Sequence, residues 1–548
     1  MSAEWWRGAV IYQIYPRSFL DANGDGTGDL PGIAAELDHV ASLGVDAIWI
    51  SPFFKSPQKD YGYDVADYVE VDPLFGTLAD ADRVIAAAHE RGLKVLVDLV
   101  LSHTSDRHPW FEQSRRDRTN PKADWYVWAD PAPDGTPPNN WLSIFGGVAW
   151  EYEPRRDQYY LHNFLKEQPD LNLHHPEVVP ALLEIARFWL ERGVDGFRLD
   201  AIDFAVHDPA LRDNPVRPRE MAVAGGLVDA TPYARQWHVH DKGLAELLPI
   251  LLEPLRRLAD AYGDVALLGE LSGDGALANA ARYTAGGRGL HMAYTFDLLG
   301  APYTAAAIGG IVDELETMIE DGWPCWSFSN HDVTRAPTRF GGDDPPEALR
   351  RQLPVLLTCL RGTPCLYQGE ELGLEEAELA YDDIRDPYGR TMWPVYKGRD
   401  GARTPMPWRA EAPAAGFTTA APWLPVPAAH RARAVDRQAG DDGSTLALLR
   451  RFLAWRRRHP ALRVGHWRRL DAAEPVLAFA RWTDAGERLV CAFNLAGTAA
   501  AWRPPMDLVA VDAPVPSPAR LAAGVVELPA YGVLIARPRD AGAAAWPS

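Results

Sequence analysis

The chain has 548 residues, of which 47% are hydrophobic and 24% are charged. This composition excludes a largely disordered chain and is sufficient for a core larger than that of one ordinary domain. The formal net charge of −20 disfavours nucleic acids and anionic membranes as partners, but it does not oppose binding of a neutral small molecule.

The N-terminal sequence MSAEWWRGAVIYQIYPRSF has neither the basic start nor the apolar run of a secretory signal. The sequence also lacks a run of about 18 apolar residues that could span a membrane. We therefore expect a cytoplasmic protein, whose oligomeric state the sequence leaves open. Free, buried thiols are expected because the cysteines lack metal-ligand spacing and have apolar neighbours; they are Cys325, Cys359, Cys365 and Cys491.

Short β-branched or aromatic runs alternate eight times with helix-length segments. Helical patterns such as residues 80–92 and 180–193 end on glycine, the usual helix stop. The alternation predicts an α/β fold, a closed parallel (β/α)8 TIM barrel, in preference to an open doubly wound sheet. The expected strands are residues 10–15, 47–50, 94–101, 195–200, 265–270, 292–297, 325–330 and 363–371.

Two regions depart from this alternation of strand and helix patterns. Residues 104–169 follow the third strand, where a short loop would be enough, so we predict a small inserted domain. Residues 461–548 contain successive strand patterns without helices, which predicts a C-terminal antiparallel β-sandwich. The barrel is assigned to the remaining residues, 1–103 and 170–460.

Acidic residues stand at the carboxyl ends of several expected strands, where barrel enzymes carry their active sites. Asp200, Glu270 and Asp332 belong to three different strands, so we expect them to meet on one rim. Glycoside cleavage needs one carboxylate to attack or activate water and a second, protonated carboxyl to assist the leaving oxygen. Arg198 shares a strand face with Asp200 and can keep it ionised. A single acid at a strand end is more often a helix cap or a surface charge; the prediction depends on the ordered set.

Several motifs of the sequence resemble those of a known family. DLVLSHTS, GFRLDAID, LLGEL and FSNHD resemble the four signature regions of glycoside hydrolase family 13, the α-amylase family. QPDLN at 168–172 resembles an additional region of its oligo-1,6-glucosidase and α-glucosidase branch. The resemblance extends to KGRDGARTPMPW at 397–408. It implies a retaining, exo-acting α-glucosidase that hydrolyses maltose-like short α-glucosides by double displacement and transfers glucose as a side activity.

The resemblance also implies roles for individual residues. Asp200 corresponds to the nucleophile, Glu270 to the general acid/base and Asp332 to the transition-state stabiliser. An arginine of GRDGAR pairs with the Asp60-type residue, and we prefer Arg399 to Arg403 for this role. The expected residues of the innermost subsite are Asp60, Tyr63 as stacking platform, His103, Phe164 as an aromatic wall, Arg198, His331, Arg399 and Arg403.

No cofactor is expected for catalysis, but the loop DANGDGTGD suggests a structural Ca²⁺ or Mg²⁺. Related α-glucosidases bind such an ion at a similar loop. A solvated acidic turn is the alternative. A second calcium site, typical of α-amylases, is disfavoured because Ser102 replaces its asparagine ligand. The expected ligands of the loop are Asp21, Asn23, Asp25, Asp29 and the carbonyl of Thr27.

Three alternatives remain beside α-glucosidase. An oligo-1,6-glucosidase is disfavoured by Ala201, because that branch tends to carry valine after the nucleophile when it prefers α-1,6 bonds. Sucrose isomerisation or trehalose synthesis would use the same intermediate, but NHDVTRAPTRFGG differs from the corresponding segment of sucrose isomerases. A non-catalytic transporter subunit would have a membrane helix and would lack the acids.

Overall fold

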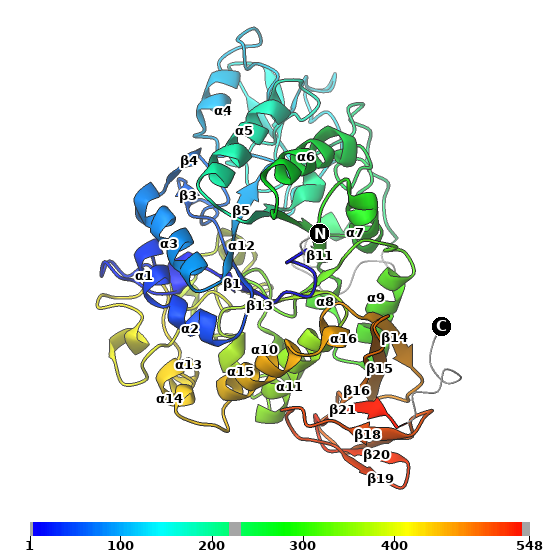
Figure 1. The fold of residues 1–548 in the computed structure, drawn as a ribbon. Helices are drawn as coiled ribbons and strands as arrows, with labels where there is room; N and C mark the ends of the chain where they lie inside the picture. Colours follow the sequence, from blue (N-terminus) through cyan, green and yellow to red (C-terminus); the bar gives the residue numbers. More distant parts are fainter. Residues whose placement is uncertain (1–3, 219–231, 540–548) are drawn as a thin grey trace.

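The structure is a computed structural model that describes residues 4–218 and 232–539 (Figure 1). Its centre is an eight-stranded parallel sheet in the order β11-β10-β9-β5-β2-β1-β13-β12. The strands are β1 (Ile11–Ile14), β2 (Ala47–Ile50), β5 (Lys94–Val100), β9 (Gly196–Asp200), β10 (Ala266–Leu271), β11 (Met292–Thr295), β12 (Cys325–Trp326) and β13 (Thr363–Tyr367).

The sheet closes on itself. Ala293 of β11 forms a parallel bridge with Pro324, immediately before β12, and thereby joins the two ends of the strand order. The predicted TIM barrel and its eight strands are therefore confirmed. The seventh strand is shorter than expected, since β12 ends at Trp326 rather than at residue 330.

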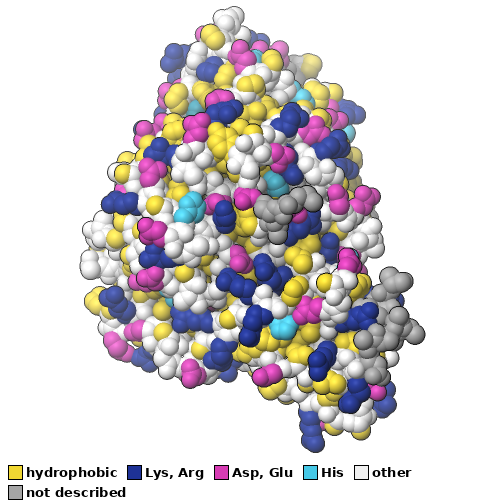
Figure 2. Space-filling view, in the orientation of Figure 1, with side chains coloured by type: hydrophobic (Ala, Val, Ile, Leu, Met, Phe, Trp, Pro, Cys, Tyr) yellow, Lys and Arg dark blue, Asp and Glu magenta, His cyan; other side chains and the backbone are white. Residues whose placement is uncertain are grey.

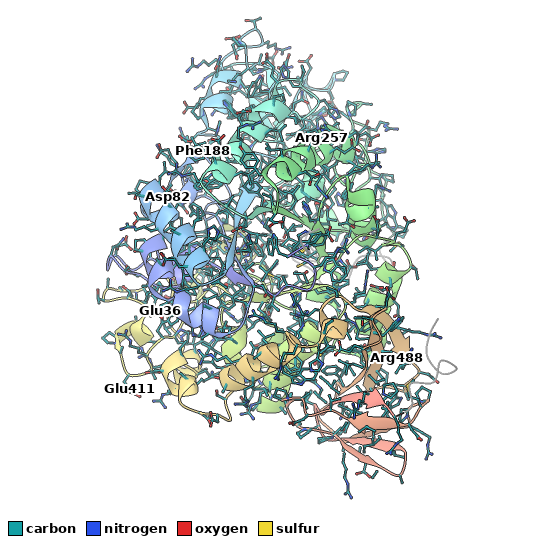
Figure 3. The ribbon with its side chains drawn as sticks, in the orientation of Figure 1. Glu36, Asp82, Phe188, Arg257, Glu411 and Arg488 are labelled. Atoms are coloured by element: carbon teal, nitrogen blue, oxygen red, sulfur yellow. The ribbon has the colours of Figure 1, made fainter. Side chains whose placement is uncertain are left out.

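Helices cover the outside of the barrel. In α3 (Leu78–Glu90) the Thr77 and Asp80 side chains form a reciprocal cap at the N-terminus, and Val84 and Ala88 face the core. Figure 3 shows Asp82 of α3 on the outer side of this layer. The other long helices of the layer are α5 (Val178–Glu191), α6 (Glu253–Tyr262), α7 (Ala276–Thr284), α9 (Ala305–Glu316), α11 (Glu347–Cys359) and α15 (Thr445–Arg456).

Shorter helices lie between these elements, as the glycine- and proline-rich connections suggest. They are α1 (Leu30–Ala35), α2 (Leu37–Ser42), α4 (Pro109–Ser114), α8 (Asp297–Gly300), α10 (Ala336–Gly341), α12 (Pro387–Met392), α13 (Ala428–Ala432), α14 (Val435–Ala439) and α16 (Pro460–Arg463).

The segment after β5 builds a small sheet of its own beside the barrel rim. An antiparallel bridge between His103 and Asp170 connects the points where the chain leaves the barrel and returns. The sheet has the order β6-β8-β7 and a separate core that includes Trp141 and Trp150. Its strands are β6 (Trp128–Ala129), β7 (Trp150–Glu153) and β8 (Gln158–Leu161), and the nearby hairpin is β3 (Phe54–Lys55) with β4 (Asp67–Val71).

The C-terminal segment forms two antiparallel sheets, as the sequence predicts, at one side of the barrel (Figure 1). Val476 and Ala492 of one sheet pack with Trp502 and Val526 of the other, which creates a core between the sheets. The strands are β14 (His466–Leu470), β15 (Val476–Trp482), β16 (Arg488–Asn494), β17 (Ala500–Trp502), β18 (Leu508–Ala510), β19 (Arg520–Ala522), β20 (Val525–Leu528) and β21 (Val533–Pro538).

Three further features concern the surface, the helices and the cysteines. In the view of Figure 2, acidic, basic and apolar side chains are mixed over the face. Within the described ranges, no helix is long and apolar enough to cross a membrane. The four cysteines are buried free thiols, as predicted.

Candidate functional site

A single buried arginine organises the carboxyl ends of the barrel strands. Arg198 of β9 has no exposed surface. Its Nη1 donates to Asp98 at 2.8 Å and to Asp200 at 2.6 Å, and its Nη2 donates to Glu270 at 2.5 Å. The guanidinium carbon lies 4.7 Å from the ring centroid of Trp49. Three carboxyl groups from three neighbouring strands therefore share one positive charge.

The two carboxyl groups expected to perform the chemistry differ in their hydrogen bonds. Glu270 accepts from the backbone amide of Ala201 at 2.9 Å and from the hydroxyl of Tyr294 at 2.8 Å. Burial raises the pKa of Glu270 to about 7, although Arg198 opposes this rise. Burial also raises the pKa of Asp200, and again Arg198 opposes it. Since two like charges this close are unfavourable, the pair retains a proton near neutral pH.

Asp332 has the opposite electrostatic environment. Burial favours its neutral form, but His331 and two guanidinium groups outweigh that effect and hold the pKa of Asp332 well below its usual range. Arg399 Nη1 lies 3.2 Å and Arg403 Nη2 lies 2.7 Å from its Oδ1. Asp332 is therefore a carboxylate near neutral pH.

The sequence left Arg399 and Arg403 as alternatives for the partner of Asp60. Arg399 Nη2 donates to Asp60 at 2.8 Å, and Arg399 lines the cavity. Arg403 lies behind it and donates to the backbone carbonyl of His331 at 2.7 Å. The geometry therefore assigns Arg399 to Asp60, while both arginines bind Asp332.

Tyr63, His103 and His331 meet at the inner wall of the cavity. The rings of Tyr63 and His331 are stacked, with centroids 5.4 Å apart. His331 Nε2 lies 2.6 Å from the Tyr63 hydroxyl, and His103 Nε2 lies 3.1 Å from the Tyr63 carbonyl oxygen. Burial lowers the pKa of His103 to about 4 and that of His331 to about 3. Both rings are neutral at neutral pH and suit hydrogen bonding to uncharged hydroxyl groups.

These residues surround a cavity of about 770 Å³. Phe164 stands in its wall, where its ring centroid lies 5.1 Å from those of both His103 and Phe204. The cavity lining combines charged groups such as Asp60 and Arg399 with aromatic rings such as Phe145 and Phe164. Expected residues that line it are Asp60, Tyr63, His103, Phe164, Asp200, Glu270, Asp332 and Arg399; Arg198, His331 and Arg403 support them from behind.

Some residues of the site were not predicted. Asp98 lies within DLVLSH, and an acidic residue inside an apolar strand was an available signal. Gln168 begins QPDLN, and its side-chain amide donates to Asp60 at 3.2 Å. Asp386, the N-cap residue of α12, lies 13 residues before Arg399 and accepts from it at 2.8 Å, and no pattern in the sequence indicates this contact. Phe145 lies over the Arg399 guanidinium at 5.3 Å.

The acidic loop after β1 is held together by its own backbone. Asp21 accepts from the amides of Gly24 and Gly26, while Asp29 accepts from the amide of Gly32 and caps α1. Asn23 and Asp25 accept from the amides of residues 25 and 27. The oxygens suit a hard cation, but they point at these amides, and residues 4–218 and 232–539 contain no group of three or more His, Cys, Asp or Glu arranged to hold a metal. The Ca²⁺ or Mg²⁺ site stays a prediction, as does the part expected of Thr27. The hydroxyl of Ser102, where α-amylases carry the asparagine ligand of a second site, lies 2.9 Å from His103 Nδ1.

The barrel and its three acids define a glycoside hydrolase, and the chain belongs to the α-amylase family. The model of the alpha-amylase catalytic domain matches residues 13–465. The chain is 52% identical to a "Probable alpha-glucosidase" of Rhizobium meliloti (strain 1021), covering 97% of both chains. It is 35% identical to an oligo-1,6-glucosidase of Parageobacillus thermoglucosidasius, covering 93% of both. The crystal structure of an α-glucosyl transfer enzyme, XgtA, superposes with a TM-score of 0.96 at 57% identity, covering 98% of this chain and 100% of the other.

We predict that Asp200→Asn and Glu270→Gln each lower kcat/KM for maltose by roughly a thousandfold or more, because each removes a reacting carboxyl group. Circular dichroism should show an intact fold. Asp195→Asn is the matched control, since Asp195 lies at the opposite end of β9 and binds Lys94. If either active-site variant stays within about tenfold of wild type, the assignment of the reacting groups is wrong.

We predict that a chelator lowers Tm by about 2–4 °C while leaving the initial rate unchanged, because an ion bound only by the folded loop stabilises that state. Thermal melts of metal-depleted and metal-loaded protein measure the difference. Asp25→Asn keeps an acceptor for the amide of Thr27 but loses the charge, so it should reduce the effect of the chelator. Identical melting curves would show that the loop is a turn without an ion.

Proposed function

We propose that this protein is a retaining, exo-acting α-glucosidase that hydrolyses terminal α-linked glucose from short, maltose-like α-glucosides. One observation carries the proposal: Arg198 binds Asp200 through one terminal nitrogen and Glu270 through the other, beside one cavity. A guanidinium that holds both groups keeps them within reach of the same glycosidic bond. Retaining glycosidases hold their two reacting carboxyl groups about 5–5.5 Å apart, and two acids bound to one guanidinium suit such an arrangement.

In the first displacement, the Asp200 carboxylate bonds to the anomeric carbon. The bond from that carbon to the leaving oxygen breaks, and Glu270 gives its proton to that oxygen. In the second displacement, the Glu270 carboxylate takes a proton from water, whose oxygen bonds to the anomeric carbon and releases Asp200. The pKa of about 7 suits Glu270 to both tasks near neutral pH.

Asp332 supports both steps through its charge. The developing oxocarbenium-like ring is electron-poor, and a carboxylate held ionised by Arg399 and Arg403 stabilises it. Positive charge on these arginines is balanced by Asp60 and Asp386, so the site does not repel the sugar ring's partial positive charge.

Exo-action is supported by a buried, polar part of the cavity wall. Asp60 and Arg399 form an ion pair there, and Gln168 adds a hydrogen bond to Asp60 from the inserted segment. Asp60, Arg399 and Gln168 all line the cavity, so this wall offers several hydrogen-bonding groups to the hydroxyls of one terminal glucose. The likeness to oligo-1,6-glucosidases keeps α-1,6 cleavage as the second candidate.

The same intermediate supports glucosyl transfer. If a sugar hydroxyl replaces water in the second displacement, a new α-glucoside forms instead of free glucose. The likeness to an α-glucosyl transfer enzyme supports transfer as a side activity. The absence of nucleic-acid and membrane partners and a cytoplasmic location remain predictions from the sequence.

We predict that the first-formed glucose is the α-anomer, because two inversions at the anomeric carbon restore its configuration. Proton NMR of maltose hydrolysis, recorded before mutarotation, measures the anomer directly. The β-anomer as the initial product would contradict double displacement and indicate an inverting enzyme.

We predict that the enzyme prefers maltose to isomaltose and that Ala201→Val lowers this preference by about tenfold. Ala201 lines the cavity next to the nucleophile, and a valine would be stiff at χ1 beside the leaving sugar. The ratio of kcat/KM values for the two disaccharides is the measurement. Because Ala201 has φ +37°, valine also strains the backbone, but a loss common to both substrates cancels in the ratio. Ala201→Gly should leave the ratio unchanged. If Ala201→Val leaves it unchanged too, Ala201 does not set linkage preference.

A further inference from the structure

Tyr294 stands directly opposite Glu270 in the barrel wall. In the parallel pairing of β10 with β11, Glu270 is in register with Tyr294, so their side chains project on the same side of the sheet. Tyr294 is 3% exposed and packs in the barrel core near Trp49, with ring centroids 6.2 Å apart. Glu270 lines the cavity and Tyr294 is not among the described residues that do so. Tyr294 therefore reaches the reaction only through its neighbours.

The hydroxyl of Tyr294 closes a ring of hydrogen bonds. It accepts from Arg198 Nη2 at 2.8 Å and donates to Glu270 Oε1 at 2.8 Å. The same Arg198 nitrogen also donates to Glu270 Oε2. A hydroxyl that accepts from a cation becomes a stronger donor, so its bond to Oε1 is strengthened by Arg198.

The two oxygens of Glu270 are fixed by different groups. Oε2 accepts from Arg198 and from the amide of Ala201, whereas Oε1 accepts from Tyr294 alone within the described chain. A carboxyl group turns easily about its last torsion, so these two sets of bonds together determine the plane of the carboxyl group. The bond from Tyr294 leaves one lone pair of Oε1 without a partner in the described chain.

We propose that Tyr294 is a positioning residue for the general acid/base: its hydroxyl fixes Oε1 of Glu270 so that the remaining lone pair serves the proton transfer with the glycosidic oxygen. This inference rests on the function proposed for Glu270 above. The ring of Tyr294 fills the core, and the hydroxyl alone carries the positioning role.

The groups around Glu270 determine whether loss of the Tyr294 hydroxyl raises or lowers the pKa of Glu270. Arg198 and the Ala201 amide favour the carboxylate, while Asp200 of β9 and Asp332 beyond β12 disfavour it. Asp98 of β5 acts through the shared Arg198. Tyr294 is a further donor to the carboxylate, so removing its hydroxyl disfavours the ionised form and raises the pKa of Glu270.

The test is Tyr294→Phe, which keeps the ring and removes the hydroxyl. We expect the alkaline limb of the kcat/KM profile to move up by about one pH unit, since one donor to the carboxylate is lost. We also expect kcat/KM to fall roughly tenfold more for maltose than for 4-nitrophenyl α-glucoside, whose leaving group needs little help from an acid.

The matched control is Tyr283→Phe, because Tyr283 is also buried, its hydroxyl donates to the carbonyl of Leu244, and neither residue is among those that line the cavity. It should keep the wild-type profile. An alkaline limb of Tyr294→Phe that stays in place or moves down overturns the inference. Glu270→Gln, measured in the same assays, distinguishes failure of the proposed function from failure of this inference. If Glu270→Gln retains activity, the role assigned to Glu270 is wrong. If Glu270→Gln is inactive but the alkaline limb of Tyr294→Phe does not move up, the role assigned to Tyr294 is wrong.

Discussion

The buried guanidinium of Arg198 is the interaction on which the rest of the site depends. A charge without solvent contact is very unfavourable unless it is paired, and Arg198 is paired with Asp98, Asp200 and Glu270. Because these groups come from adjacent strands, the barrel must close in one register to satisfy the charge. The same contacts that hold the charge also hold Asp200 and Glu270, the proposed nucleophile and acid, so the stability of this region and its proposed chemistry share one cause.

The site keeps similar carboxyl groups in different protonation states by controlling what lies next to each. Burial and nearby acids raise the pKa of Glu270, whereas the charges of Arg399 and Arg403 lower the pKa of Asp332. Neutral His103 and His331 add hydrogen bonds without adding charge. The cavity can thus bind an uncharged sugar while one carboxyl group donates a proton and another stabilises positive charge.

The inserted segment and the loop near α12 complete the site from outside the barrel. Phe164 and Gln168 lie near the end of the inserted segment, and Asp386 is the residue just before α12. Through Arg399, Asp386 connects this loop to Asp60 and Asp332. Elements far apart in the sequence therefore build the polar wall around Asp60 and Arg399.

The sequence by itself determined the eight barrel strands and the antiparallel C-terminal sheets, because hydrophobic periodicity and glycine stops are local signals. Motifs likewise predicted Asp200, Glu270 and Asp332 as the reacting groups, since each lies in or shortly after a recognisable strand. Tertiary structure alone decided that Arg399 and not Arg403 pairs with Asp60, that Asp386 supports it, and that Tyr294 faces Glu270. These outcomes depend on strand register and on loop paths that close across the barrel rim. Both arginines have the same chemistry four residues apart, and only the folded chain places one at the cavity and the other behind it.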